Sequence, residues 1–285
     1  MSASNDIAAA RSRFAQDLKN SAPIVNNPSI VEAFTTVPRE DYLGKGPWRV
    51  HSRMRIGLSR TISTDDPRQV YHDVLVSIDD EKGINTGQPS LWALVFDQLN
   101  LKPGQTILQV GAGAGYFTAI LAELVGKTGR VFAYEIDKAL ALRAKENLSR
   151  YEQVEVFAGD ATQSRDLPAL DVVIVFAGVT HVPEQWLKNL APGGQIVLPF
   201  TTASKWGFML LLERDGDRFP VRPLFQCGFY HCDSARRGDE EKALANALVA
   251  SGGMPDRLGE YHLRKGDDQI TDAWLTTDTY WISKG

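Results

Sequence analysis

Three glycines at alternating positions, Gly111, Gly113 and Gly115, directly follow the apolar run 106–110. A helical pattern begins right after them, so the chain turns tightly from a buried strand into a helix. Glycine tolerates the backbone angles of such a turn and lets a ligand approach the main chain closely. The acidic residue Glu135 ends the next apolar run. In a doubly wound sheet, a carboxylate at this position accepts hydrogen bonds from two ribose hydroxyls, which indicates a cofactor containing a nucleoside.

The spacing of the glycines separates the candidate cofactors. A dinucleotide-binding loop needs glycine at the sixth position, where this chain has Tyr116 or, counted from the second glycine, Thr118. The glycine loop does not end in the Gly-Lys-Ser/Thr of a phosphate-binding P-loop, because Tyr116 and Phe117 follow Gly115. Gly-x-Gly-x-Gly followed by an acid resembles the first motif of class I methyltransferases that use S-adenosylmethionine. That cofactor has no pyrophosphate, so the dinucleotide spacing is not required.

Two further strand ends carry residues suited to such a cofactor. Gly159-Asp160-Ala161 follows the third expected strand, and 176–181 follows the fourth. Ligands of open α/β sheets bind at the carboxyl ends of the strands. A carboxylate at Asp160 can therefore accept a hydrogen bond from the adenine amino group. The fourth end, which includes Ala177 and His181, is expected to face the sulfonium and the substrate.

The elements that position these residues alternate regularly through the middle of the chain. Apolar runs predict strands at 106–110, 131–135, 154–157, 172–176 and 195–199. Helical spacing predicts helices at 116–125, 137–149 and 183–190. This alternation is typical of a doubly wound, mostly parallel sheet. We expect an α/β fold of the Rossmann-like, seven-stranded methyltransferase type with N-terminal helical and C-terminal additions.

The flanking regions have weaker patterns. Helices are expected at 5–20, from a Ser29 cap through Phe34, at 88–99 and at 239–251, with an irregular stretch over 38–85 that holds one short strand at 74–78. Runs at 206–214 and 221–229 predict an antiparallel hairpin at the sheet edge, and 279–283 a closing strand. We divide the chain into an N-terminal cap and substrate loop (1–87), a cofactor-binding core (88–225) and a C-terminal extension (226–285).

The composition is that of an ordinary globular protein. The chain has 285 residues, of which 43% are hydrophobic and 23% charged, and a net charge of −4, which disfavours a nucleic-acid partner. Two cysteines provide neither a disulfide framework nor a set of zinc ligands, so no metal is expected. The sequence shows no signal peptide and no membrane span, and we expect a cytoplasmic protein without a membrane partner. The oligomeric state stays open.

Several separate segments carry a family resemblance. They are Val37-Pro38-Arg39-Glu40, Gln88-Pro89, the loop 111–118, Gly159-Asp160-Ala161 and the stretch 187–199. Together they resemble protein-L-isoaspartate O-methyltransferases over about two-thirds of the chain. The resemblance implies an S-adenosyl-L-methionine-dependent methyltransferase that esterifies a carboxylate in a peptide or protein.

The substrate loop departs from the family pattern. The family carries a serine that contacts the acceptor carboxylate, and this chain has Gly87 at that position. Thr86 or Asn85 is a candidate replacement. The departure leaves two alternatives open. One is methylation of a small molecule or natural-product peptide with His181 as the base, since a hydroxyl acceptor needs one. The other is a binding module that keeps the cofactor fold without catalysis.

The expected site therefore has two parts. The catalytic candidates are Thr86 and His181, the latter read alternatively as a loop residue that caps the following helix. The cofactor-binding candidates are Gln88, Gly111, Ala112, Gly113, Gly115, Tyr116, Glu135, Ile136, Gly159, Asp160, Ala161 and Ala177.

Overall fold

The computed structural model describes residues 3–21, 25–55, 58–164, 166–256, 260–264 and 273–284. The chain forms two compact units. The first contains Met1–Gly104, Ala112–Val131 and Asp137–Val156, and the second contains Gln105–Gly111, Phe132–Ile136 and Phe157–Gly285. Among the described helices, none is long and apolar enough to cross a membrane. The division of the chain at residues 87 and 225 stays a prediction.

The helices of the first unit follow the sequence pattern closely. They are α1 (Ala3–Ser21), α2 (Pro28–Thr36), α3 (Pro89–Leu99), α4 (Tyr116–Val125) and α5 (Lys138–Asn147), with short 3-10 turns η1 (Arg39–Tyr42) and η2 (Pro67–Val70). The predicted cap of α2 is wrong by two positions. Asn27 caps this helix, because its side-chain oxygen accepts a hydrogen bond from the backbone N–H of Ser29 at 3.0 Å.

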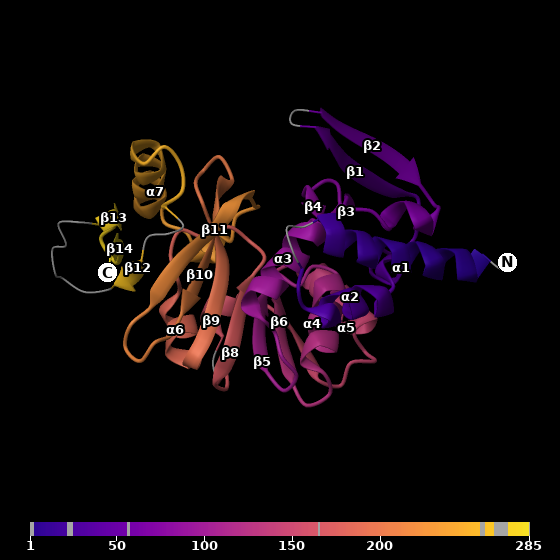
Figure 1. Ribbon diagram of the computed structural model, residues 1–285, viewed down its shortest axis with the longest axis horizontal. Coiled ribbons are helices and arrows are strands. Elements are labelled where there is room, and N and C mark those ends of the chain that lie inside the picture. The colour runs from indigo at the N-terminus through magenta and orange to yellow at the C-terminus, as the bar shows by residue number, and fades with distance from the viewer. Residues whose placement is uncertain are drawn as a thin grey trace. The chain divides into compact units, whose positions relative to one another are not determined.

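The prediction of an irregular stretch over 38–85 is wrong, although the one short strand expected at 74–78 is confirmed as β3 (Leu75–Asp79). The first unit contains a four-stranded antiparallel sheet in the order β2-β1-β3-β4 (Figure 1). Its strands are β1 (Trp48–Arg55), β2 (Leu58–Thr64), β3 (Leu75–Asp79) and β4 (Ile84–Asn85). Val50 pairs with Ile62 on one side and with Val76 on the other. The sequence pattern did not predict β1 and β2, because polar residues surround their few apolar positions.

The second sheet has ten strands in the order β13-β14-β12-β11-β10-β9-β8-β5-β6-β7. The predicted core strands are confirmed as β5 (Thr106–Val110), β6 (Arg130–Glu135), β7 (Val154–Ala158), β8 (Leu170–Val175) and β9 (Leu190–Thr201). β8 pairs in parallel with β5 and with β9. Residues 172–175 are all 0% exposed, which explains the unbroken apolar run of a strand that is covered on both faces.

The C-terminal part extends the ten-stranded sheet. β10 (Trp206–Glu213) and β11 (Pro220–Gly228) form the predicted antiparallel hairpin, but its placement at the sheet edge is wrong. β11 pairs with β12 (Tyr261–Arg264), and β14 (Trp281–Lys284) and β13 (Ala273–Thr276) lie beyond it. The predicted helix at 239–251 is α7 (Gly238–Ala250).

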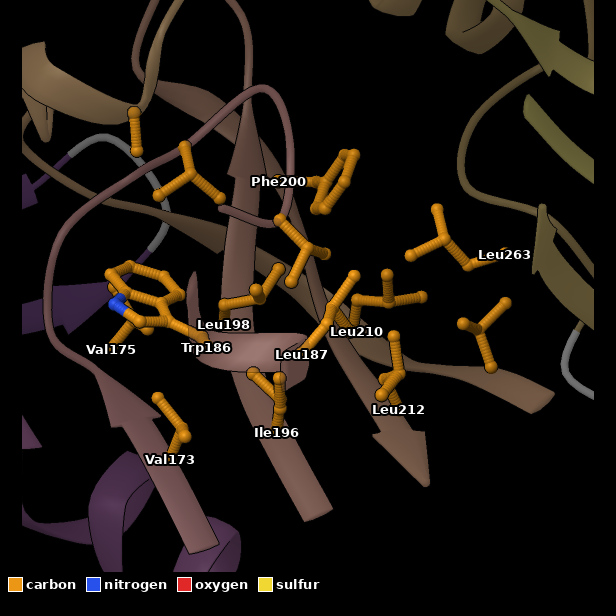
Figure 2. Packing of buried hydrophobic residues seen from close by; sticks show 14 of the residues in the cluster. Val173, Val175, Trp186, Leu187, Ile196, Leu198, Phe200, Leu210, Leu212 and Leu263 are labelled. Atoms are coloured by element: carbon orange, nitrogen blue, oxygen red, sulfur yellow. The ribbon is translucent and has the colours of Figure 1, made fainter. Parts of the chain in front are cut away.

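One hydrophobic core joins the extension to the central strands of this unit. In Figure 2, Trp186 and Leu187 of α6 (Glu184–Asn189) lie against the strands that carry Leu198 and Leu210. Leu263 of β12 belongs to the same cluster. Because these side chains are almost fully removed from water, the extension is part of the folded unit rather than a loose tail.

Candidate functional site

The carboxyl ends of four neighbouring strands are joined by backbone hydrogen bonds in the second unit. Gly111 N–H donates to Tyr134 O at 2.8 Å, and Gly159 N–H donates to Glu135 O at 2.9 Å. On the other side, Phe176 N–H donates to Val110 O at 2.8 Å. The ends of β8, β5, β6 and β7 therefore follow one another in the order that a ligand spanning several strand ends requires.

Two carboxylates stand at this edge in different environments. Glu135 ends β6 and is only 8% exposed, while the apolar Ile136 beside it is 66% exposed. Asp160 caps the short helix η3 (Ala161–Gln163): its Oδ1 accepts the Thr162 N–H, and its Oδ2 accepts the Thr162 hydroxyl, both at 2.9 Å. Ser234 Oγ donates to Oδ1, also at 2.9 Å. A buried acid next to an exposed apolar side chain suits a ribose and its attached base.

The glycine turn is fixed by close packing at two positions. Gly111 has φ +86°, and a Cβ there would lie 3.3 Å from the Cβ of Phe176. Gly115 has φ +95°, and a Cβ there would lie 2.8 Å from Leu148 Cδ1, within the first unit. Both positions therefore exclude larger residues. Asn147 Nδ2 donates to Ala114 O at 2.9 Å and holds the turn to α5.

The other turn residues of the predicted site lie in the first unit. Ala112 is 6% exposed, and a Cβ at Gly113 would have Ile78 Cδ1 as its nearest neighbour at 3.8 Å, so Gly113 borders open space. Tyr116 is 4% exposed and packs edge-on against Phe34 at 6.2 Å between ring centroids. Burial raises the pKa of the Tyr116 phenol well above its ordinary value.

The predicted substrate loop explains why this chain lacks the expected serine. Gly87 has φ +75°, and a Cβ there would lie 2.9 Å from Trp92 Nε1. A side chain at this position would thus need a strained backbone and a displaced indole. Gln88, predicted to touch the cofactor, donates its side-chain N–H to Asp73 Oδ2 at 2.7 Å within the first unit.

Thr86 is held by the buried Arg39. This arginine belongs to the segment 37–40 and was not predicted as a site residue. Arg39 is 0% exposed and donates to Val70 O at 2.8 Å, to Val74 O at 2.7 Å and to Thr86 Oγ1 at 2.9 Å. Thr86 Oγ1 also accepts the Val76 N–H at 3.2 Å. Burial lowers the pKa of the Arg39 guanidinium, which nevertheless stays charged at neutral pH.

His181 meets a buried carboxylate that sequence reasoning missed. Its Nδ1 lies 2.7 Å from Oε2 of Glu240, which is 0% exposed and comes from α7. Thr180 Oγ1 donates to the same oxygen at 2.7 Å, and Thr279 Oγ1 donates to Oε1 at 2.8 Å. No local sequence signal joins residues 59 positions apart.

The charge of Glu240 is stabilised by these contacts. Burial alone would raise the pKa of Glu240, but the hydrogen bonds from His181, Thr180 and Thr279 outweigh burial and hold that pKa below its ordinary value. An ionised carboxylate only accepts hydrogen bonds, so His181 Nδ1 carries a proton. Neutral His181 therefore has its lone pair on Nε2.

An open α/β sheet with a glycine turn after one strand and acids after the next two defines the fold class of S-adenosylmethionine-dependent methyltransferases. The model of the family Protein-L-isoaspartate(D-aspartate) O-methyltransferase (PCMT) matches residues 64–231. The chain belongs to this family. It is therefore a methyltransferase, and its cofactor is S-adenosyl-L-methionine.

Individual relatives agree with the family match. The chain is 34% identical to a Methanopyrus kandleri protein-L-isoaspartate O-methyltransferase over 197 residues, which cover 67% of this chain and 76% of that protein. It is also 34% identical to the Thermotoga maritima enzyme of that name over 175 residues, or 60% of this chain. The chain spans 50% of the length of the Thermotoga protein.

Two solved structures share the fold. A protein-L-isoaspartate O-methyltransferase superposes with a TM-score of 0.66 at 21% identity, over 96% of this chain and 88% of that one. A Plasmodium falciparum candidate for the same enzyme, in complex with S-adenosyl-L-homocysteine, superposes with a TM-score of 0.60 at 21% identity, over 78% of this chain and 97% of that one. At this identity the likeness establishes the fold.

Proposed function

We propose that this protein transfers a methyl group from S-adenosyl-L-methionine to the carboxylate of an isoaspartyl residue in a peptide or protein. The relatives from Methanopyrus and Thermotoga are named for that reaction, and the family model covers the strand ends described above. The observation that carries the proposal is the succession of Gly111, Glu135 and Asp160 at neighbouring strand ends of one unit.

The residues at those strand ends fit the cofactor. Gly111 has φ +86° and packs closely against Phe176, so the chain turns tightly at the end of β5 without a side chain at this position. Glu135 would accept hydrogen bonds from the two ribose hydroxyls, and the exposed Ile136 would cover one face of the adenine. Among the described residues, Asp160 Oδ2 has a single donor, Thr162, and so keeps capacity for the adenine amino group.

Within the first unit, Asn85 would contact the acceptor carboxylate in place of the missing serine. Thr86 is a poor candidate, because its hydroxyl already accepts from Arg39 and Val76 and donates to Gly87 O at 3.2 Å. Asn85 Oδ1 accepts the Gly87 N–H at 2.9 Å. In the described part of the chain, Asn85 Nδ2 has no hydrogen-bond partner, so its two N–H groups are available for an acceptor carboxylate.

The reaction needs positioning more than proton transfer. The bound cofactor supplies an electrophilic methyl group. An acceptor carboxylate is ionised at neutral pH, so no base has to remove a proton from it. The protein must hold the carboxylate oxygen in line with the methyl carbon and exclude water, and such positioning supplies several kcal/mol of the barrier. In this scheme His181 stabilises a loop and is not required for chemistry.

The proposal is tested with two synthetic peptides that differ only in an isoaspartyl or an aspartyl linkage at one residue. With methyl-labelled cofactor, alkali-labile label should enter the isoaspartyl peptide and not the aspartyl one. Equal labelling of the two peptides would contradict the substrate assignment. If neither peptide is labelled by a protein that binds S-adenosyl-L-homocysteine, the assignment is also wrong, while the cofactor assignment stands.

The role of Asn85 has a separate test. Asn85→Ala should raise the KM for the isoaspartyl peptide about tenfold, because a hydrogen bond to a charged group is lost, and leave the affinity for S-adenosyl-L-homocysteine unchanged. Gln69→Ala is the matched control, since Gln69 is exposed on η2 in the same unit. An unchanged KM in Asn85→Ala would exclude this residue from acceptor binding.

A further inference from the structure

A segment of the C-terminal extension, residues 230–240, is bonded along the loop that follows β8. We call this segment the strap. Gly178 N–H donates to Tyr230 O at 2.6 Å, and Cys232 N–H donates back to Gly178 O at 2.9 Å. Thr180 N–H donates to Ala235 O at 3.0 Å. The backbone of the strap thus follows the loop at the carboxyl end of β8.

Side chains of the strap reinforce this attachment. Arg236 Nη1 donates to Gly178 O at 3.1 Å and to Thr201 Oγ1 at 2.9 Å. Arg237 N–H donates to Thr180 Oγ1 at 3.0 Å. Glu240 holds Thr180 and His181, as described above. The family match ends at residue 231, so most of the strap lies outside the part that this chain shares with the family model.

The strap also reaches the predicted adenine-binding acid. Ser234 Oγ donates to Asp160 Oδ1 at 2.9 Å across 74 positions of sequence. The other donor residue is Thr162, two positions from Asp160, which moves with the same turn. Within the described residues, Ser234 is the only donor that fixes this carboxylate relative to a different segment. Oδ1 then has two donors and Oδ2 one, so the remaining acceptor capacity lies on Oδ2.

We propose that the strap forms one wall of the cofactor site and that Ser234 is a positioning residue that sets selectivity for adenine through Asp160. The inference rests on the proposed contact between Asp160 and the adenine amino group. A carboxylate oxygen with a fixed direction accepts from an amino group, whereas the carbonyl oxygen of hypoxanthine offers no proton and is repelled. Ser234 thereby gives the extension a function in cofactor recognition.

The test compares two ligands, S-adenosyl-L-homocysteine and S-inosyl-L-homocysteine, by isothermal titration with the full chain. Wild type should prefer the adenine ligand. Ser234→Ala should lose about fivefold to tenfold in affinity for it and keep its affinity for the inosine ligand within about twofold, so the preference falls. Ser234→Thr keeps a hydroxyl and should restore the preference.

Ser251→Ala is the matched control, because the acceptors of the Ser251 hydroxyl in the described part of the chain are Ala247 O and Gly253 O at the end of α7. Asp160→Asn separates the possible failures. If Asp160→Asn abolishes the preference and Ser234→Ala does not, or if Ser234→Ala weakens both ligands equally, the inference is wrong and the proposed cofactor site stands. If wild type binds neither ligand, the proposed function itself fails.

Discussion

Arg39 in the first unit and Glu240 in the second are both 0% exposed, and each holds a loop of the predicted site. The hydrogen-bond partners of the two residues differ in charge. The acceptors of Arg39 are three backbone carbonyls and the Thr86 hydroxyl. Glu240 has hydroxyl donors, His181 and, at 3.7 Å, the guanidinium of Arg237. The cation is thus solvated by neutral groups, while the anion has a charged partner, Arg237, beside its hydroxyl and imidazole donors.

This difference bears on what each loop can bind. Within the described residues, the hydrogen-bond partners of Arg39 are uncharged, and its positive charge, which also interacts with Asp73, should favour an anionic acceptor near Thr86. Arg237 offsets part of the charge of Glu240, and the hydrogen bonds from Thr180 and His181 to Glu240 hold the loop after β8 in place. The comparison predicts that Arg39 matters for stability and acceptor binding, and Glu240 for stability and cofactor binding.

The largest effect is expected at Arg39. Arg39→Met leaves the buried carbonyls of Val70 and Val74 without donors, at about 1–3 kcal/mol each, so urea unfolding should show a loss of about 3–5 kcal/mol. Arg39→Lys should lose less unfolding free energy than Arg39→Met. It should still raise the KM for the isoaspartyl peptide, because an ammonium cannot reach four acceptors in fork geometry. Arg68→Met, which breaks an exposed ion pair with Asp66, should leave the midpoint of urea unfolding unchanged. A midpoint in Arg39→Met equal to that of wild type would contradict this account.

Loss of Glu240 should have the next largest effect. Glu240→Ala leaves His181, Thr180 and Thr279 without their acceptor and should cost about 2–4 kcal/mol of unfolding free energy. Affinity for S-adenosyl-L-homocysteine should fall with it, while the KM for peptide changes little. Asp239→Ala, an exposed neighbour on the same helix, should match wild type. A Glu240→Ala variant with a raised KM for the peptide and an unchanged affinity for the cofactor would contradict these separate roles of Arg39 and Glu240.

Acidic pH should weaken the contacts of Glu240 and leave those of Arg39 intact. The folded pKa of Glu240 lies below its ordinary value of 4.5, so this residue stabilises the fold above that pH and loses its contribution as pH falls through the folded value. Arg39 stays charged throughout. Arg237 and His181 are direct partners of Glu240, and the charge of Glu240 also acts on the Tyr280 phenol.

Hydrogen exchange measures this transition. Below about pH 4, backbone amides of α7 should lose protection before those around Val76 in the first unit. Equal loss in both regions would contradict the assignment, as would an unchanged acid response in Glu240→Ala.

The smallest effect is expected at His181. An ionised acceptor needs no base, so His181→Asn, which keeps an N–H for Glu240, should change kcat for the isoaspartyl peptide less than about threefold. A loss of a hundredfold or more with normal cofactor affinity would instead support the alternative in which His181 is the base for a hydroxyl acceptor.

The same two regions show what the sequence could and could not predict. The strands that carry Gly111 and Glu135 were found because buried parallel strands read as unbroken apolar runs between helical segments. In the antiparallel sheet around Val50, β3 was predicted at 74–78, but the other strands were missed because they are mostly polar. In the N-terminal region, the cap of α2 was assigned to Ser29 instead of Asn27, since both residue types favour that position.

Long-range partners were not predictable from local pattern. Arg39 belonged to a recognisable motif, but nothing in the spacing shows that its guanidinium turns inward to Thr86. His181 was singled out as a base candidate, yet its partner Glu240 lies on a helix whose pattern predicts only an amphipathic surface element. Such contacts depend on the topology that brings distant segments together, and a single sequence does not record it.

Titration of S-adenosyl-L-homocysteine into wild type and Glu135→Gln tests the central claim most directly. Wild type should bind S-adenosyl-L-homocysteine with a Kd in the micromolar range. Glu135→Gln should bind at least about tenfold more weakly, because the ribose hydroxyls lose a charged acceptor. No heat of binding up to about millimolar ligand, or equal affinity of the two proteins, would contradict the claim that these strand ends hold the methyl donor.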